Sequence, residues 1–173
     1  ETWEIGIPRS AVRIDASPTD VDIASHPRLQ LVVPYLGDNV EQKEEVARVY
    51  LDALELKEVS TTNLAFLNVG LGHALYAQKR GEEARFPYMR VVTMYPDEPE
   101  YVAHSLQNAG QCFLDLHGHA RNKGDMNASD QLLVKGMKLL YECAGRFGKT
   151  GPGSRARTTY RAKKAEMEEA EGR

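Results

Sequence analysis

The residues best suited to chemistry lie close together, between Cys112 and His119. His117 and His119 are separated by one residue, and Cys112 and Asp115 precede them. Imidazole, thiolate and carboxylate groups bind zinc, but a structural zinc site needs four ligands at defined spacings. No second close-set group of Cys or His stands near in the sequence. We therefore expect no metal here; the alternative is a helical-bundle enzyme or metal-binding protein that uses His117 and His119.

Two other motifs typical of enzymes, the GxSxG motif and the phosphate-binding loop, are not found in the sequence. The chain contains no GxSxG sequence, which would place a serine nucleophile on a sharp turn. Gly148-Lys149-Thr150 has the residue types that end a phosphate-binding loop, but Cys143 stands where that loop's first glycine belongs. The residues before it also have the pattern of a helix, whereas the loop follows a strand. The sequence therefore favours a protein that is not an enzyme and has no cofactor.

The composition is typical of an ordinary globular protein. The chain has 173 residues, enough for one domain with a sizeable core, and 27% of them are charged. A net charge of -3 gives no general attraction to nucleic acid or to anionic membranes. The most apolar run, Leu29 to Leu36, is far shorter than the roughly 18 residues of a membrane helix. We therefore expect a soluble protein with no nucleic-acid partner and no membrane span.

Helical periodicity is strongest between Ala65 and Glu98. Apolar residues recur at three- and four-residue steps on two faces of the first half. They are Leu64, Leu67, Leu71 and Leu75 on one face, and Phe66, Val69 and Tyr76 on the other. A helix with two apolar faces must be covered twice. Ser60-Thr61-Thr62 caps this helix, Lys79-Arg80-Gly81 supplies a turn, and Pro96 ends a second helix, so the segment is predicted to be a helical hairpin.

This hairpin resembles the tetratricopeptide repeat, a family of helical hairpins about 34 residues long that stack into a superhelix. The matching positions are Leu71-Gly72, Leu75, Ala84, Tyr88 and Pro96. Four positions depart from the family pattern: Asn68 stands where a bulky residue is usual, Val91 replaces a small residue, and Gly81 and Pro87 lie where the second helix should be running. Pro87 lacks a backbone N–H, which predicts a late start or a bend in that helix.

A second pair of segments repeats the offsets of the central hairpin. Leu106, Ala109-Gly110 and Phe113 correspond to Asn68, Leu71-Gly72 and Leu75, while Gly136, Leu140 and Cys143 correspond to Ala84, Tyr88 and Val91. The first segment is expected to begin at Pro99 and the second to be capped by Ser129-Asp130. The polar residues 116–129 between them are expected to be a loop or an extended helix end. A weaker unit contains Ala47, Leu51 and Leu54.

The resemblance implies an all-α fold, in which antiparallel helical hairpins stack as a short α-solenoid. The sequence divides into an extended N-terminal arm (1–26), a tetratricopeptide-like helical domain (27–148), and a linker with a charged C-terminal tail (149–173). Trp3, Ile5 and Ile7 alternate with polar residues, so the arm either packs on the helical body or adds a strand to another subunit. The tail is expected to be a solvated helix or a frayed end, with docking onto a partner as the alternative. The chain begins at Glu1 without Met, so we expect a processed protein or a fragment.

Cys112 and Cys143 fall in the two helices of the second hairpin. Small buried hydrophobic side chains are expected there. A disulfide between them stays open, because the sequence alone does not establish the geometry that such a bond requires.

The resemblance also implies a function in protein binding. Tetratricopeptide proteins hold an extended peptide or a partner helix in a concave groove formed by the first helix of each hairpin. The groove-facing positions of this chain would be Phe66, Val69, His73, Tyr76, His104, Gln107, Gln111 and Asp115. This set lacks the Lys, Asn and Arg residues with which some members of the family bind a terminal carboxylate. Phe66 and Val69 could equally pack against the N-terminal segment.

We therefore expect a scaffold, adaptor or assembly factor that binds a protein or peptide partner and belongs to a larger complex. A structural subunit of a homo-oligomer, joined through the Trp3 arm and the charged tail, is a further alternative.

Overall fold

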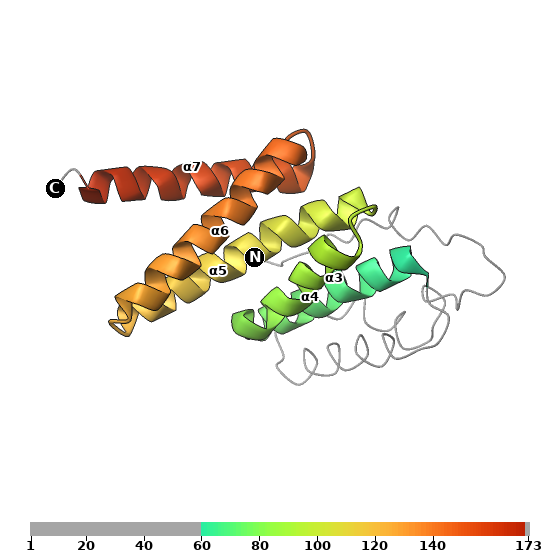
Figure 1. The fold of residues 1–173 in the computed structure, drawn as a ribbon, viewed down its shortest axis with the longest axis horizontal. Helices are drawn as coiled ribbons and strands as arrows, with labels where there is room; N and C mark the ends of the chain where they lie inside the picture. The colour runs from blue at the N-terminus through green and yellow to red at the C-terminus, as the bar shows by residue number, and fades with distance from the viewer. Residues whose placement is uncertain (1–59, 172–173) are drawn as a thin grey trace. The chain divides into compact units, whose positions relative to one another are not determined.

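The computed structural model describes residues 60–171. The helices of this part are α3 (Thr61–Ala77), α4 (Gly81–Met94), α5 (Pro99–Asn122), α6 (Met126–Arg146) and α7 (Gly151–Glu171) (Figure 1). They confirm the all-α prediction for the described residues. The predicted arm at 1–26, with Trp3, and the weaker unit at 47–54 lie outside them. No helix between residues 60 and 171 combines the length and the apolar character that crossing a membrane requires.

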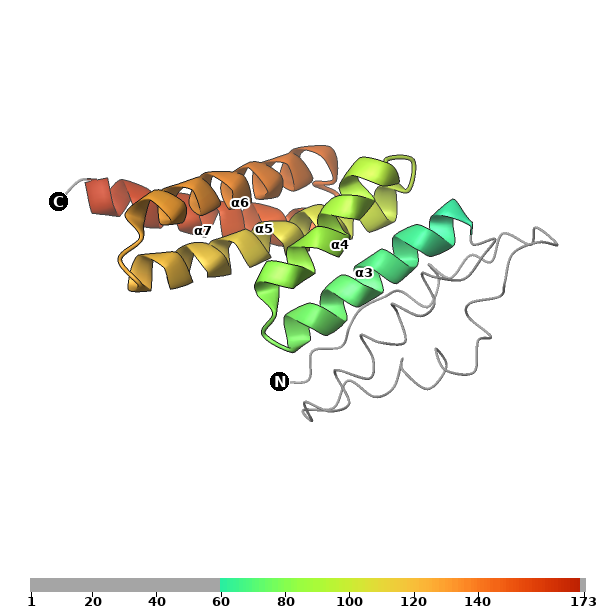
Figure 2. The same ribbon diagram turned by 60° about the horizontal axis from the view of Figure 1, so that its bottom comes forward.

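The chain divides into two compact units between Tyr101 and Val102, within α5. The first unit contains the hairpin of α3 and α4 (Figure 2). The second contains the rest of α5, together with α6 and α7, and α7 packs against α6. Each unit therefore has a helix pair of its own.

Helix α3 begins as the sequence predicts. The Ser60 hydroxyl accepts a hydrogen bond from the Asn63 N–H at 3.2 Å, which satisfies one of the free donors of the first turn. Both predicted apolar stripes are buried. The buried members are Leu67, Leu71 and Leu75 on one face, and Phe66 and Val69 on the other. The prediction that this helix is covered on two faces is confirmed.

The turn after α3 differs in detail from the prediction. Lys79 has a positive φ of 62°, and the chain reverses there. Gly81 is already the first residue of α4, so the prediction that Pro87 delays this helix is wrong. An acidic first turn compensates for the missing side-chain cap: the Arg80 guanidinium donates to both Glu83 carboxylate oxygens, at 2.7 and 2.6 Å. Pro87 stays inside the helix as a buried residue, and the turn before it is already formed.

A close contact between a glycine and a tyrosine contributes to the packing of α3 against α4. A Cβ atom on Gly72 would lie 2.5 Å from the nearest atom of the Tyr88 ring, so only a residue without a side chain fits there. Tyr88 is completely buried, and its hydroxyl lies 2.8 Å from His73 Nδ1. The ring therefore packs on the α3 backbone while its polar end is satisfied.

The α5–α6 hairpin is built in the same way. A Cβ atom on Gly110 would lie 2.7 Å from Leu140 Cγ, and one on Gly136 would lie 3.0 Å from the Gly110 carbonyl oxygen. Three contacts mark the antiparallel register: Ala103 with Cys143, Gly110 with Gly136, and His117 with Ser129. Successive contacts are seven residues apart on both helices, the spacing of an antiparallel coiled coil. Small residues occupy most of these positions, so the two backbones approach closely.

The polar segment between these helices is mostly helical. Helix α5 continues to Asn122, and only Lys123 to Asp125 lie outside a helix, with Gly124 at a φ of +80°. The extended helix end is therefore confirmed, and the alternative of a long loop is wrong. Buried side chains of this segment hold the end of α5 against α6, since His117 contacts Ser129.

The predicted cap of α6 is also wrong. Asp125 caps this helix: its carboxylate accepts a hydrogen bond from the Ala128 N–H at 3.0 Å. Ser129 lies in the first turns of α6, where it is buried. An Asp and a Ser both suit a helix cap, and the tertiary contact with His117 decides which of them takes that role.

The charged tail forms helix α7, which begins at Gly151, inside the segment predicted to be a linker. The Thr150 hydroxyl accepts a hydrogen bond from the Gly153 N–H at 3.2 Å and caps the helix. Pro152, Gly153 and Ala156 are buried. Small side chains therefore attach a polar helix to the second unit without a broad apolar face.

A Gly110→Ala substitution should destabilise the protein by about 1–3 kcal/mol, because the new methyl group would displace the fully buried Leu140. Gly118→Ala, on the same helix, has open space around it and should stabilise by up to about 1 kcal/mol through helix propensity. Urea unfolding followed by circular dichroism measures both. Equal stability of the two variants would contradict the close contact at Gly110.

Candidate partner-binding surface

Four of the predicted partner-binding residues form a polar ridge on α5. His104, Gln107, Gln111 and Asp115 follow one another at steps of three and four residues, so they share one face of the helix. All four side chains are partly exposed. We call this set the α5 ridge.

Hydrogen bonds along α5 hold parts of the ridge in place. Gln111 Nε2 donates to Asp115 Oδ1 at 2.9 Å. Asn108, which the sequence analysis did not include, donates from Nδ2 to the His104 carbonyl oxygen at 2.8 Å. Its spacing of four residues from His104 was the signal that could have identified it. The ridge is therefore a partly ordered row of amide, imidazole and carboxylate groups.

His104 is neutral at pH 7. Burial lowers its pKa from 6.5 to about 4, and the positive charge of Arg155 lowers it further. Arg155 lies in the first turns of α7 and is exposed. Arg155 was not among the predicted site residues, because the tail was predicted to be separate from the helical domain. The imidazole can therefore both donate and accept a hydrogen bond at neutral pH.

The four predicted residues on α3 lie in a different setting. Phe66 and Val69 are buried, and the Phe66 ring meets the Tyr101 ring edge-on at a centroid distance of 6.4 Å. His73 and Tyr76 are partly exposed, and His73 contacts the Tyr88 hydroxyl. The structure thus places four predicted residues in the first unit and four in the second. Of the four predicted residues on α3, His73 and Tyr76 are the two with surface that a partner could contact.

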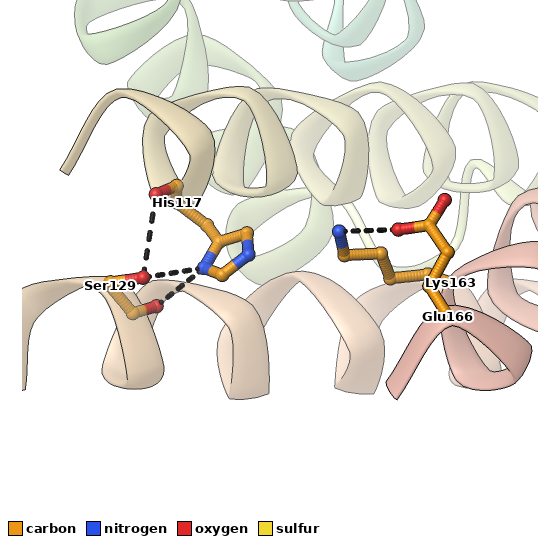
Figure 3. Close-up of polar contacts among 4 residues, drawn as sticks. All are labelled: His117, Ser129, Lys163 and Glu166. Carbon is orange, nitrogen blue, oxygen red and sulfur yellow. Dashed lines mark hydrogen bonds and ion pairs between the residues drawn. The ribbon is translucent and has the colours of Figure 1, made fainter. Parts of the chain in front are cut away.

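The two histidines considered as metal ligands do not converge. His117 is buried, and its Nδ1 lies 2.8 Å from Ser129 Oγ and 3.1 Å from the Ser129 carbonyl oxygen (Figure 3). His119 is exposed, and two residues along an α-helix turn a side chain by about 200°. Among residues 60–171 no three His, Cys, Asp or Glu side chains are grouped so that they could hold a metal ion.

Both cysteines are buried, and the structure contains no disulfide between Cys112 and Cys143. The Cys143 thiol donates to the Ala103 carbonyl oxygen at 3.3 Å. Burial raises the pKa of this thiol to about 11, which keeps it protonated at pH 7. Cys143 therefore acts as a small packing residue with one weak hydrogen bond, as the sequence predicts.

Partial burial of His104 makes the stability of the protein depend on pH. Its folded-state pKa of about 4 is below the ordinary value of 6.5, so the unfolded chain binds a proton more readily. The contribution of His104 to the free energy of unfolding is therefore fully present above pH 6.5 and is lost as the pH falls towards 4. We expect a loss of at most about 3 kcal/mol in the free energy of unfolding across this window.

A His104→Gln variant isolates this contribution, because the carboxylates titrate alike in both proteins. The stability difference between wild type and variant should shift in favour of the variant as the pH falls from 7 to about 4. Urea unfolding at each pH measures the difference. A difference that does not change with pH would show that His104 ionises in the same way in the folded and unfolded states.

No protein-family model, no curated protein and no solved structure matches this chain. Contacts within the chain itself are therefore the observations that bear on function. The most informative are the glycine contacts that close each hairpin and the polar ridge on the first helix of the second hairpin.

Proposed function

We propose that this chain is a non-catalytic scaffold or adaptor of the tetratricopeptide type, which binds a peptide or a helix of a partner protein. The observation that carries the proposal is the α5 ridge: polar side chains in one row on the first helix of a hairpin. In this family the first helix of each hairpin lines the binding groove.

The matching construction of the two hairpins supports the repeat. Gly72 meets the ring of Tyr88, and Gly110 meets the side chain of Leu140. The sequence analysis pairs the two glycines with each other, and the two large residues likewise. Two hairpins that close through equivalent positions are what repetition of one structural unit produces.

The chemistry of the α5 ridge favours a polar, extended or helical ligand. A neutral His104 and the amides of Gln107 and Gln111 can donate to and accept from peptide groups. Arg155 adds positive charge near His104, and Asp115 adds negative charge about 16 Å further along the helix. A partner with an acidic group towards one end and a basic group towards the other would therefore be oriented along α5.

Selection of peptides from a displayed random library against the intact chain tests this function. Fluorescence anisotropy then gives the affinity of a selected peptide for each variant. Gln111→Ala should weaken binding about tenfold, because it removes a ridge amide and releases Asp115 from its hydrogen bond. His73→Ala and Tyr76→Ala test in the same way whether the α3 surface also contributes.

Gln131→Ala is the matched control. Gln131 lies on α6, and its amide bonds Asn127 four residues away, as Gln111 bonds Asp115. This variant should bind the peptide like wild type. Equal affinities of Gln111→Ala and wild type for the peptide would show that the α5 ridge is not part of the binding site. A failure to select any peptide would contradict the proposed peptide-binding function.

A further inference from the structure

Helix α6 carries an exposed apolar stripe on the side away from its core residues. Met126, Val134 and Tyr141 are 53%, 66% and 66% exposed, and they lie within about a quarter of a turn of one another around the helix axis. The core residues Gly136 and Cys143 face elsewhere. Large apolar side chains gathered on one exposed face mark an interaction surface more often than scattered ones do.

Two charged residues of opposite sign interrupt this stripe. Asp130 lies four residues before Val134, and Lys138 lies four residues after it. Both are exposed. Eight residues, about 12 Å of helix, separate them, so they do not pair with each other. We call Met126, Asp130, Val134, Lys138 and Tyr141 together the α6 stripe.

The α6 stripe of one copy is complementary to the α6 stripe of a second copy when the two helices run antiparallel. If two copies of α6 cross at Val134, each Asp130 lies opposite the Lys138 of the other copy, and Met126 lies opposite Tyr141. A parallel arrangement would place like charges together, which disfavours it. We infer that this stripe is the contact surface of a symmetric homodimer, in which α6 packs antiparallel against α6 of a second copy of this chain.

The ends of the stripe strengthen this inference. The ring of Tyr160 on α7 lies 5.5 Å from that of Tyr141, so two aromatic side chains stand together where Met126 of the second copy would arrive. Methionine packs favourably against aromatic rings. The interface would then contain one Val134 pair on the symmetry axis, together with two ion pairs and two methionine–tyrosine contacts whose members are related by the symmetry.

One helix face from each copy buries less than the roughly 800 Å² per partner of a standard interface, so we expect a weak dimer with a dissociation constant in roughly the micromolar range. This interface lies on α6, whereas the proposed partner-binding ridge lies on α5. Loss of peptide binding would therefore leave the dimer unaffected, and loss of the dimer would leave the ridge intact.

Substitutions that exchange the charges of Asp130 and Lys138 test the dimer. Sedimentation velocity of the full chain over a range of concentrations measures how strongly each variant associates. Asp130→Lys places a lysine opposite Lys138 of the other copy at both ion-pair positions of the dimer. Lys138→Asp places an aspartate opposite Asp130 of the other copy at the same two positions. Each variant alone should associate at least about tenfold more weakly than wild type. An equimolar mixture of the two should recover dimers, because every charge then meets its opposite.

Lys135→Asp is the matched control, since Lys135 is exposed on α6 but lies outside the stripe. It should dimerise like wild type, and circular dichroism should show all three variants folded. A wild type that stays monomeric would overturn the inference and leave another occupant for the stripe, either residues 1–59 of the same chain or a different protein. Single variants that still dimerise, or a mixture that does not recover, would overturn it as well.

Discussion

Both helical hairpins within residues 60–146 depend on a glycine that lets a large side chain of the second helix reach the backbone of the first. Gly72 admits Tyr88, and Gly110 admits Leu140. A glycine inside a helix costs about 1 kcal/mol relative to alanine. Complete burial of Tyr88 and Leu140 offsets that cost, since a buried side chain of this size contributes roughly 1.5–3 kcal/mol. Tight helix pairing is therefore gained at the expense of local helix stability.

Polar contacts then select the register in which α5 and α6 pair. His117 with Ser129, and Cys143 with the Ala103 carbonyl, lie seven residues to either side of the glycine contact. A shift of one helical turn would leave buried polar atoms without partners, at about 1–3 kcal/mol for each group. The close contact of Leu140 with Gly110 and the polar contacts on either side of it therefore favour the same register.

The tail helix connects the fold to the candidate binding surface. Buried Ala156 and the capped start of α7 attach this helix to the second unit, and Arg155 beside them lowers the pKa of His104. If α7 were a separate tail, its charged residues would be solvated and would not act on His104. The charge state of the α5 ridge is thus set partly by a segment distant from it in sequence.

Apolar spacing by itself determined the helical character of the central hairpin and of the segments that form most of α5 and α6, because helix periodicity is a local property. The residues of the α5 ridge were predicted from the resemblance to a repeat, and their three- and four-residue steps place them on one helix face. Apolar spacing did not determine where α5 ends, which of Asp125 and Ser129 caps α6, or that Arg155 lies near His104. Those features depend on contacts between helices, such as that of His117 with Ser129. Only the tertiary structure decided them, because residues far apart in sequence compete there for the same hydrogen bonds and the same space.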